Sequence, residues 1–211
     1  MHFYESVLID TIDGFQCKVY ANSHPEGFVI VKPKYIPESV LDFTGLKKRF
    51  LFGKCMTRFN LFNKKEIVEE NLARLKSTFA YYFYECPLHK NWFLVVPKDK
   101  IKKTYDTREG VKELMKVPVD NVDPYLKATQ GFIELMLKSG IRIDDIGITH
   151  STLLGNYTYG KSDIDILVFG KDNGWKVLNF LETAEHPLLK WKSEEDWAKY
   201  YRDRVISTQY S

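Results

Sequence analysis

The sequence predicts an α+β fold in which a β-rich N-terminal domain, residues 1–118, precedes a small α/β domain, residues 119–211. Two observations predict it. Short runs of alternating apolar and polar residues, separated by turn formers, dominate the first sixty positions, and this alternation is typical of strands. Apolar residues at helical spacing dominate the second half. The proline-bearing segment 117–124 lies between the two patterns, so we place the domain boundary there.

The composition indicates a folded globular protein. Of the 211 residues, 44% are hydrophobic and 28% are charged, which is typical of chains with a sizeable core. We expect no contact with membranes, because no apolar run is long enough to span a bilayer and the first residues lack the features of a signal peptide. Three scattered cysteines favour a reducing compartment, so we expect a cytoplasmic protein. The net charge of +3 is too small to imply nucleic-acid binding by itself.

The first half is expected to begin with a hairpin. Val7–Ile12 and Phe15–Tyr20 flank an Asp13-Gly14 turn, a frequent hairpin signal. Further strands are predicted at residues 27–33, 48–52, 55–61 and 92–97. One amphipathic helix over residues 64–82 should lie on this sheet, the polar stretch 98–103 should be a loop, and a short helix should cover residues 107–115.

The second half is expected to begin with a helix capped by Asp123, with Pro124 in its first turn and Gly140 at its end. A short strand over residues 146–149 should then run into a helix capped by Ser151. The next predicted strand is Asp163–Phe169. Two helices should follow it, over residues 174–185 and after a capping box at Ser193.

The stretch from Ile146 to Gly170 carries most of the functional information. Successive side chains of a strand point to opposite faces, so Asp163 and Asp165 are expected on one face. Neighbouring carboxylates raise each other's pKa unless a cation neutralises them, and a divalent metal with oxygen ligands does so. The predicted helix start at Ser151 offers N–H groups that bind anions. The alternative is an ordinary buried strand with two Asp residues at its exposed end.

Ser151-Thr-Leu-Leu-Gly155, followed by Gly160-Lys-Ser162-Asp163-Ile-Asp165, resembles the signature of the nucleotidyltransferase superfamily related to DNA polymerase beta, in its archaeal type. That signature is Gly-Ser, a short helix with a second Gly, and a strand carrying Asp-x-Asp. The resemblance covers roughly residues 119–185 and implies a nucleotidyltransferase-like α/β domain with a short mixed sheet. It also implies that the catalytic and metal-binding residues are Asp163 and Asp165, with Mg²⁺ or Mn²⁺ as cofactor. The nucleotide-binding residues that it implies are His150, Ser151, Gly155 and Ser162.

The function implied by the resemblance is the transfer of a nucleoside monophosphate from a nucleoside triphosphate to an acceptor. The acceptor stays open between RNA, a protein and a small molecule. Where the family has Gly before Ser, this chain has His150, which either donates a hydrogen bond to phosphate or marks a loss of activity. The alternative function is therefore a catalytically inactive nucleotide- or nucleic-acid-binding or regulatory module on the same scaffold.

The family also supplies a third acidic residue from a later strand, and the sequence after Gly170 offers none. Only Leu188–Lys192 has strand character there, and it carries no acid. Three explanations stay open: the chain is a fragment, the site works with two carboxylates, or it does not catalyse. Arg204–Ser211 has no helix terminator, so we expect the second domain to be incomplete at its C-terminus.

A basic and aromatic segment in the first half supports a third hypothesis, a nucleic-acid-binding protein that works through its first domain. Cations interleaved with phenylalanines are typical of single-strand binding. Alternation across a half-buried strand also explains the pattern and is the interpretation that we adopt. The residues concerned are Lys47, Lys48, Arg49, Phe50, Phe52, Lys54, Arg58 and Phe59.

Overall fold

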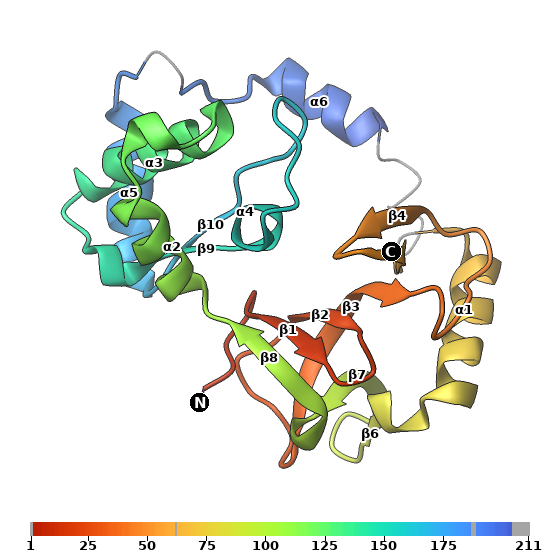
Figure 1. The fold of residues 1–211 in the computed structure, drawn as a ribbon. Helices are drawn as coiled ribbons and strands as arrows, with labels where there is room; N and C mark the ends of the chain where they lie inside the picture. Colours follow the sequence, from red (N-terminus) through yellow and green to blue (C-terminus); the bar gives the residue numbers. More distant parts are fainter. Residues whose placement is uncertain (1, 62, 187–188, 204–211) are drawn as a thin grey trace.

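The fold was analysed in a computed structural model, which describes residues 2–61, 63–186 and 189–203. It confirms a mixed α+β protein: the described residues form a large antiparallel sheet and six α-helices (Figure 1). Within these residues, no helix has both the length and the apolar character needed to cross a bilayer.

The large sheet has eight strands, all paired antiparallel. They are β1 (Leu8–Thr11), β2 (Gln16–Val19), β3 (Phe28–Pro37), β4 (Lys48–Leu51), β5 (Lys54–Arg58), β6 (Phe83–Cys86), β7 (Asn91–Pro97) and β8 (Ile101–Tyr105). The main order is β4-β5-β3-β2-β1-β8, and β7 pairs with both β3 and β6. The predicted hairpin is confirmed, because β1 and β2 pair directly around the Asp13-Gly14 turn.

Two parts of this sheet differ from the sequence-based expectation. The stretch 98–103, expected to be a loop, contributes the start of β8, which pairs with β1 at the end of the sheet order. Charged side chains are compatible with such a strand because one of its edges has no neighbouring strand. The strand β3 also runs on through Pro33 to Pro37, longer than predicted.

Helix α1 (Lys65–Thr78) covers one face of the sheet, as predicted, but it ends at Thr78 because a 3₁₀ turn begins at Ala80. Leu75 of this helix is fully buried in the first hydrophobic cluster. In the same cluster the rings of Phe15 and Tyr82 stack at 4.8 Å between centroids. Figure 1 shows α1 alongside the strands of the first half. The core face of the sheet is therefore the face toward α1.

A second hydrophobic cluster is formed by the elements from α2 to α5. These are α2 (Thr107–Lys116), α3 (Pro124–Leu137), β9 (Ile146–Ile148), α4 (His150–Leu154), β10 (Ile166–Val168) and α5 (Lys171–Thr183), and α6 (Glu194–Asp203) is the last described element. The Asp123 carboxylate accepts hydrogen bonds from the N–H groups of Tyr125 and Leu126, which confirms the predicted cap of α3. Val111 of α2 packs in this second cluster. The domain boundary at residues 118/119 stays a prediction.

Several details around the motif correct the expectation. The strand β10 begins at Ile166, three residues after Asp163, and it pairs antiparallel with β9, so the described residues form a two-stranded antiparallel sheet where a mixed one was expected. The cap of α4 is Thr149 and not Ser151. Helix α5 begins at Lys171, before the predicted start at residue 174.

The end of the chain bears on two further expectations. The capping box at Ser193 is confirmed, because its hydroxyl accepts from the Asp196 N–H and the Asp196 carboxylate accepts from the Ser193 N–H. The segment Arg204–Ser211, on which the expectation of an incomplete domain rests, lies outside the described residues, as does the start of the segment Leu188–Lys192.

The motif region is attached to the first half by specific contacts. The Thr149 hydroxyl donates to the Ser6 carbonyl at 2.8 Å and is buried. The Tyr4 hydroxyl donates to the Asp106 carboxylate at 2.9 Å, and the Tyr4 ring meets Phe169 edge-on at 5.0 Å. Residues at the N-terminus therefore fix the strands β9 and β10 relative to the large sheet.

Candidate functional site

The pairing of β9 with β10 brings the two parts of the motif together. Ile148 lies opposite Ile166, and one residue further the Thr149 N–H donates to the Asp165 carbonyl at 3.2 Å. All three residues of β9 are buried, which anchors the turn that follows. The start of α4 therefore lies beside Asp165. Asp163 and Asp165 both precede β10, so the expectation that they share one face of a strand is not met.

His150 begins α4 in an unusual backbone conformation. Its φ is +52°, in the left-handed region that favours glycine. The family signature has Gly at this position, and the positive φ gives that preference a backbone reason. The His150 Nδ1 lies 3.0 Å from the Asp165 Oδ2, so the side chain turns toward the carboxylate. His150 thus occupies the space between the turn and one of the two predicted metal ligands.

Asp165 lies in a positive environment. Its pKa is held below the usual range, first by the hydrogen bond from His150 and then by the charges of Lys34 and Lys18 on the large sheet. Burial and, after it, the neighbouring Arg58 charge lower the pKa of Lys34 to about 8, while Asp165 opposes the shift. The hydrogen bond from His150, assisted by the lysine charges, therefore keeps the Asp165 carboxylate ionised.

Asp163 is held through its backbone. The Tyr125 hydroxyl donates to the Asp163 carbonyl at 2.7 Å and lies at the same distance from the Thr152 hydroxyl of α4. The Tyr125 ring stacks on Tyr157 at 4.2 Å between centroids, and the Tyr157 hydroxyl bonds the carboxylate of Asp123. This network ties the loop before β10 to α3 and α4. The exposed Asp163 side chain therefore projects from a fixed backbone.

The other predicted nucleotide-binding residues lie along α4 and the following loop. Ser151 is in the first turn of α4, and its backbone carbonyl accepts from the Asn156 N–H at 3.1 Å. Gly155 ends the helix with φ +68°, which glycine adopts without strain. The Ser162 hydroxyl accepts from the Thr158 N–H at 2.8 Å, so this side chain stabilises the loop. Their roles in nucleotide binding stay predictions.

The residues present provide only part of a metal site. Among residues 2–61, 63–186 and 189–203, no three His, Cys, Asp or Glu side chains are grouped so that they could hold a metal ion. Mg²⁺ is nevertheless held in many enzymes by one or two carboxylates together with substrate phosphates. Asp163 and Asp165 fit that second arrangement, provided that His150 releases the Asp165 carboxylate.

Comparison with protein-family models, curated proteins and solved structures finds no match to this chain. The resemblance to nucleotidyltransferases therefore rests on the sequence motif.

Sequence reasoning missed the lysines of the large sheet. Lys18 and Lys34 alternate with buried residues in β2 and β3, a pattern that indicates only a strand with one polar face. Their nearness to Asp165 depends on how the two halves of the chain meet, and no local signal records that. The pair Lys32 and Lys34, separated by Pro33, was the available hint, because a proline inside a strand often marks a bulge.

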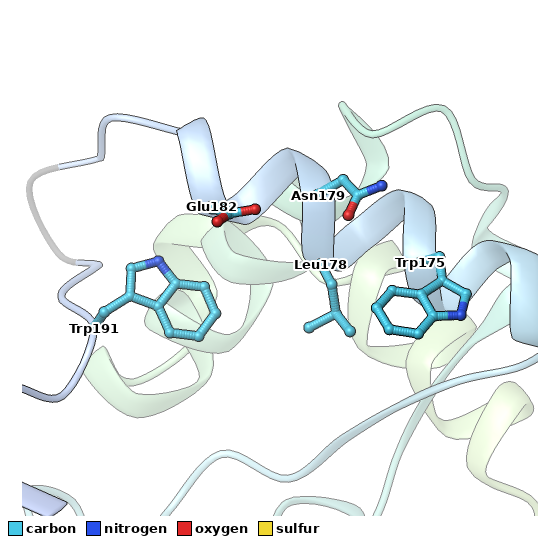
Figure 2. A pocket seen from close by; sticks show the side chains of 5 residues that line it. All are labelled: Trp175, Leu178, Asn179, Glu182 and Trp191. Atoms are coloured by element: carbon cyan, nitrogen blue, oxygen red, sulfur yellow. The ribbon is translucent and has the colours of Figure 1, made fainter. Parts of the chain in front are cut away.

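A pocket on α5 has different chemistry (Figure 2). Trp175 and Leu178 of α5 and Trp191 after it line an apolar depression, in which Asn179 and Glu182 supply the polar groups. The Trp191 indole N–H donates to a carbonyl of α5 at 3.4 Å. The lining contains no cation, so it does not suit a phosphate.

Proposed function

We propose that this protein is a metal-dependent nucleotidyltransferase, which moves a nucleoside monophosphate from a nucleoside triphosphate to an acceptor in the cytoplasm. On this proposal residues 119–211 are a nucleotidyltransferase-like domain and residues 1–118 contribute to the site. The observation that carries the proposal is the hydrogen bond from the Thr149 N–H to the Asp165 carbonyl at 3.2 Å, because it holds the start of α4 beside the acidic pair. A triphosphate bound at the start of α4 would reach both the N–H groups of the turn and the acidic residues.

The chemistry follows from these positions. The acceptor hydroxyl oxygen bonds to the α-phosphorus, the bond from that phosphorus to the bridging oxygen breaks, pyrophosphate leaves with the electron pair, and the hydroxyl proton passes to water. Bound Mg²⁺ would neutralise phosphate oxygens and activate the hydroxyl, with Asp163 and Asp165 as its protein ligands. The Ser151 hydroxyl and the N–H groups of the turn orient the triphosphate. The charge of Lys34, on the large sheet, acts on the Asp165 carboxylate.

One observation favours the second candidate, a catalytically inactive binding module. The 3.0 Å contact between His150 and Asp165 satisfies a carboxylate that a metal would otherwise use. If this pair persists when nucleotide binds, the turn still holds phosphate but the metal has one acidic ligand. Nucleotide would then bind with little dependence on Mg²⁺.

The test is transfer of an α-³²P-labelled nucleoside triphosphate by the purified protein, with Mg²⁺ or Mn²⁺ and with RNA, protein or no added acceptor. Labelled product that needs the metal and disappears in Asp165→Ala supports the enzyme. The control is Asp172→Ala, which removes an acid from the first turn of α5, outside the motif. Absence of product together with metal-independent nucleotide binding would favour the inactive module, and product in Asp165→Ala would contradict the assigned site.

A further inference from the structure

The strand β3 contains a β-bulge centred on Lys34. Gln16 of β2 lies opposite Tyr35, and the next residue, Cys17, lies opposite Pro33, which leaves Lys34 as the extra residue. Cys17 and Ile36 both lie in the core on the α1 side of the sheet. Pro33, opposite Cys17, and Ile36 thus face the same core although they are three residues apart, so the alternation of side chains between the two faces is broken. Lys34 and Tyr35, which lie between them, face away from that core.

The bulge gathers cations from neighbouring strands on this face. Lys18 of β2 lies opposite Lys32, which shares its side of β3 with Lys34. Arg58 of β5 lies opposite Tyr35, on the same face. Arg49 of β4 lies opposite Met56 of β5. Met56 and Arg58 are two residues apart in β5 and so share a face, which places Arg49 on the same side of the sheet as Arg58. The charges of Arg58, Lys18 and Arg49 all act on Lys34. We call Lys18, Lys34, Arg49 and Arg58 the cationic face.

In the part of the chain that the structure describes, the cations of this face are not matched by ion pairs, and Asp165 is the acidic residue whose charge acts on Lys34. Lys48, in the same sheet, is paired with Glu38 and Asp42. In contrast, no described acidic residue forms an ion pair with Lys18, Lys34 or Arg58. Like charges gathered on a partly buried surface repel each other, and an anionic ligand relieves that repulsion.

The strand β4 and the turn after it carry exposed aromatic side chains. Phe50 directly follows Arg49 and so points to the opposite face of the sheet, whereas Phe52 lies in the turn at the end of β4. Phe50 of β4 is 78% exposed and Phe52, in the turn that follows, is 53% exposed. The preferred explanation from sequence, an alternating half-buried strand, is therefore wrong for β4, since Lys48, Arg49 and Phe50 are all exposed. Exposed aromatics beside cations suit single-stranded nucleic acid, whose bases stack on such rings.

We propose that the cationic face binds the phosphate backbone of a single-stranded nucleic acid, which serves as the acceptor with its end at Asp165. The proposal rests on the proposed transferase function and names its acceptor class. The cations span β4 to β2, three interstrand steps or roughly 14 Å. That span matches about four stacked nucleotides at roughly 3.4 Å each. Phosphates would follow the cations, while a base stacks on Phe52 at the end of β4.

The test is fluorescence anisotropy with a 5′-fluorescein-labelled 12-nucleotide RNA and the matching DNA, titrated with the full chain at 50 to 200 mM KCl. Lys34→Gln should weaken binding about three- to tenfold and reduce the salt slope by about 0.7, the value for one lost phosphate contact on a single strand. Lys34→Arg should retain wild-type binding because it keeps the charge. Arg58→Gln repeats the test at a second position. Lys65→Gln, on the exposed surface of α1, removes the same charge elsewhere and is the matched control.

Equal affinities in Lys34→Gln and Lys65→Gln, for both oligonucleotides, would overturn the proposal. Unlabelled ATP with Mg²⁺ is the second arm: if Lys34→Gln weakens ATP binding and leaves oligonucleotide binding intact, the cations hold the triphosphate, and the nucleic-acid assignment is wrong. Lys34-dependent oligonucleotide binding without any nucleotide transfer supports the cationic face and refutes the transferase. Transfer to an acceptor other than a nucleic acid, unaffected by Lys34→Gln, supports the transferase and refutes the nucleic-acid role of the cationic face.

Discussion

Replacing His150 by glycine should leave the protein about as stable as the wild type. The His150 backbone, at φ +52°, costs a non-glycine residue about 1 to 2 kcal/mol, and glycine removes that cost. The greater freedom of glycine in the unfolded chain takes back about 0.5 to 1 kcal/mol. The lost pair with Asp165, whose side chain is 41% exposed, contributes at most about 1 kcal/mol after solvent screening. The net change is within about 1 kcal/mol.

Comparison with His150→Ala makes this prediction sharp. Alanine loses the same pair with Asp165 but keeps the backbone strain, so the glycine variant should be at least as stable as the alanine variant. At an ordinary helix position the order is reversed, with alanine better by about 1 kcal/mol. Urea unfolding midpoints of the two variants measure the sign directly. Gly131→Ala, in the middle of α3 with open space around its Cα, is the control, because alanine should be more stable than glycine at this ordinary helix position. An alanine variant clearly more stable than the glycine variant would refute the left-handed conformation of His150.

The same two variants test whether His150 competes with a metal for Asp165. Removing the imidazole frees the carboxylate, so Mn²⁺ affinity should rise in both variants, by up to about fivefold if the pair contributes about 1 kcal/mol. Isothermal titration calorimetry with Mn²⁺, alone and with a nucleoside triphosphate, measures the metal affinity of each variant and of the wild type. Weaker triphosphate binding in both variants would instead identify His150 as a phosphate ligand. Unchanged affinities for metal and for triphosphate would contradict any role of His150 in the site.

Three further predictions concern single side chains. Asp163→Asn and Asp165→Asn should each weaken Mn²⁺ binding in electron paramagnetic resonance titrations, and wild-type affinity in either would remove that residue from the metal site. Ser151→Ala should weaken triphosphate binding by about 1.5 to 3 kcal/mol in calorimetry, the contribution of one hydrogen bond to a charged group, and no loss would place the phosphate elsewhere. Lys34 has a pKa of about 8 in the folded protein, below its ordinary value of 10.5, so the unfolded chain binds more protons between these values. Stability in urea should therefore rise from about pH 8 to pH 10.5, and Lys34→Gln should lack that rise; equal slopes would contradict the burial of this ammonium group.

The elements that could be predicted from sequence are those with strong local signals. The Asp13-Gly14 turn specifies the β1–β2 hairpin, and the Asp123-Pro124 pair specifies the start of α3. The strand β8 was missed because the stretch 98–103, which contains its start, is mostly charged, and its pairing with β1 makes a strand of residues 101–105. Propensity is a weak guide for such strands, since cross-strand neighbours determine their stability.

The candidate site shows the same division between local and tertiary information. The nearness of the turn at His150 to Asp165 could be predicted, because a strand, a short helix and a second strand return the chain to the same edge. The pair between the two side chains could not, since it depends on a positive φ that histidine rarely adopts. The Gly of the family signature indicates the backbone conformation at position 150. The histidine that replaces it here adds a side chain, and that side chain makes the contact with Asp165.

The cationic face was beyond sequence reasoning for a geometric reason. In a regular strand Lys34 and Tyr35 would point to opposite faces, and Arg58, opposite Tyr35, would lie across the sheet from Lys34. One extra residue in β3 reverses this relation and brings Lys34 and Arg58 together. A bulge is set by the pairing of β3 with β2 on one side and β5 on the other, so the sequence of β3 alone does not specify it. Since the result is a repulsive cluster of cations near Asp165, the bulge costs stability unless an anion binds there, which is why we connect it with function.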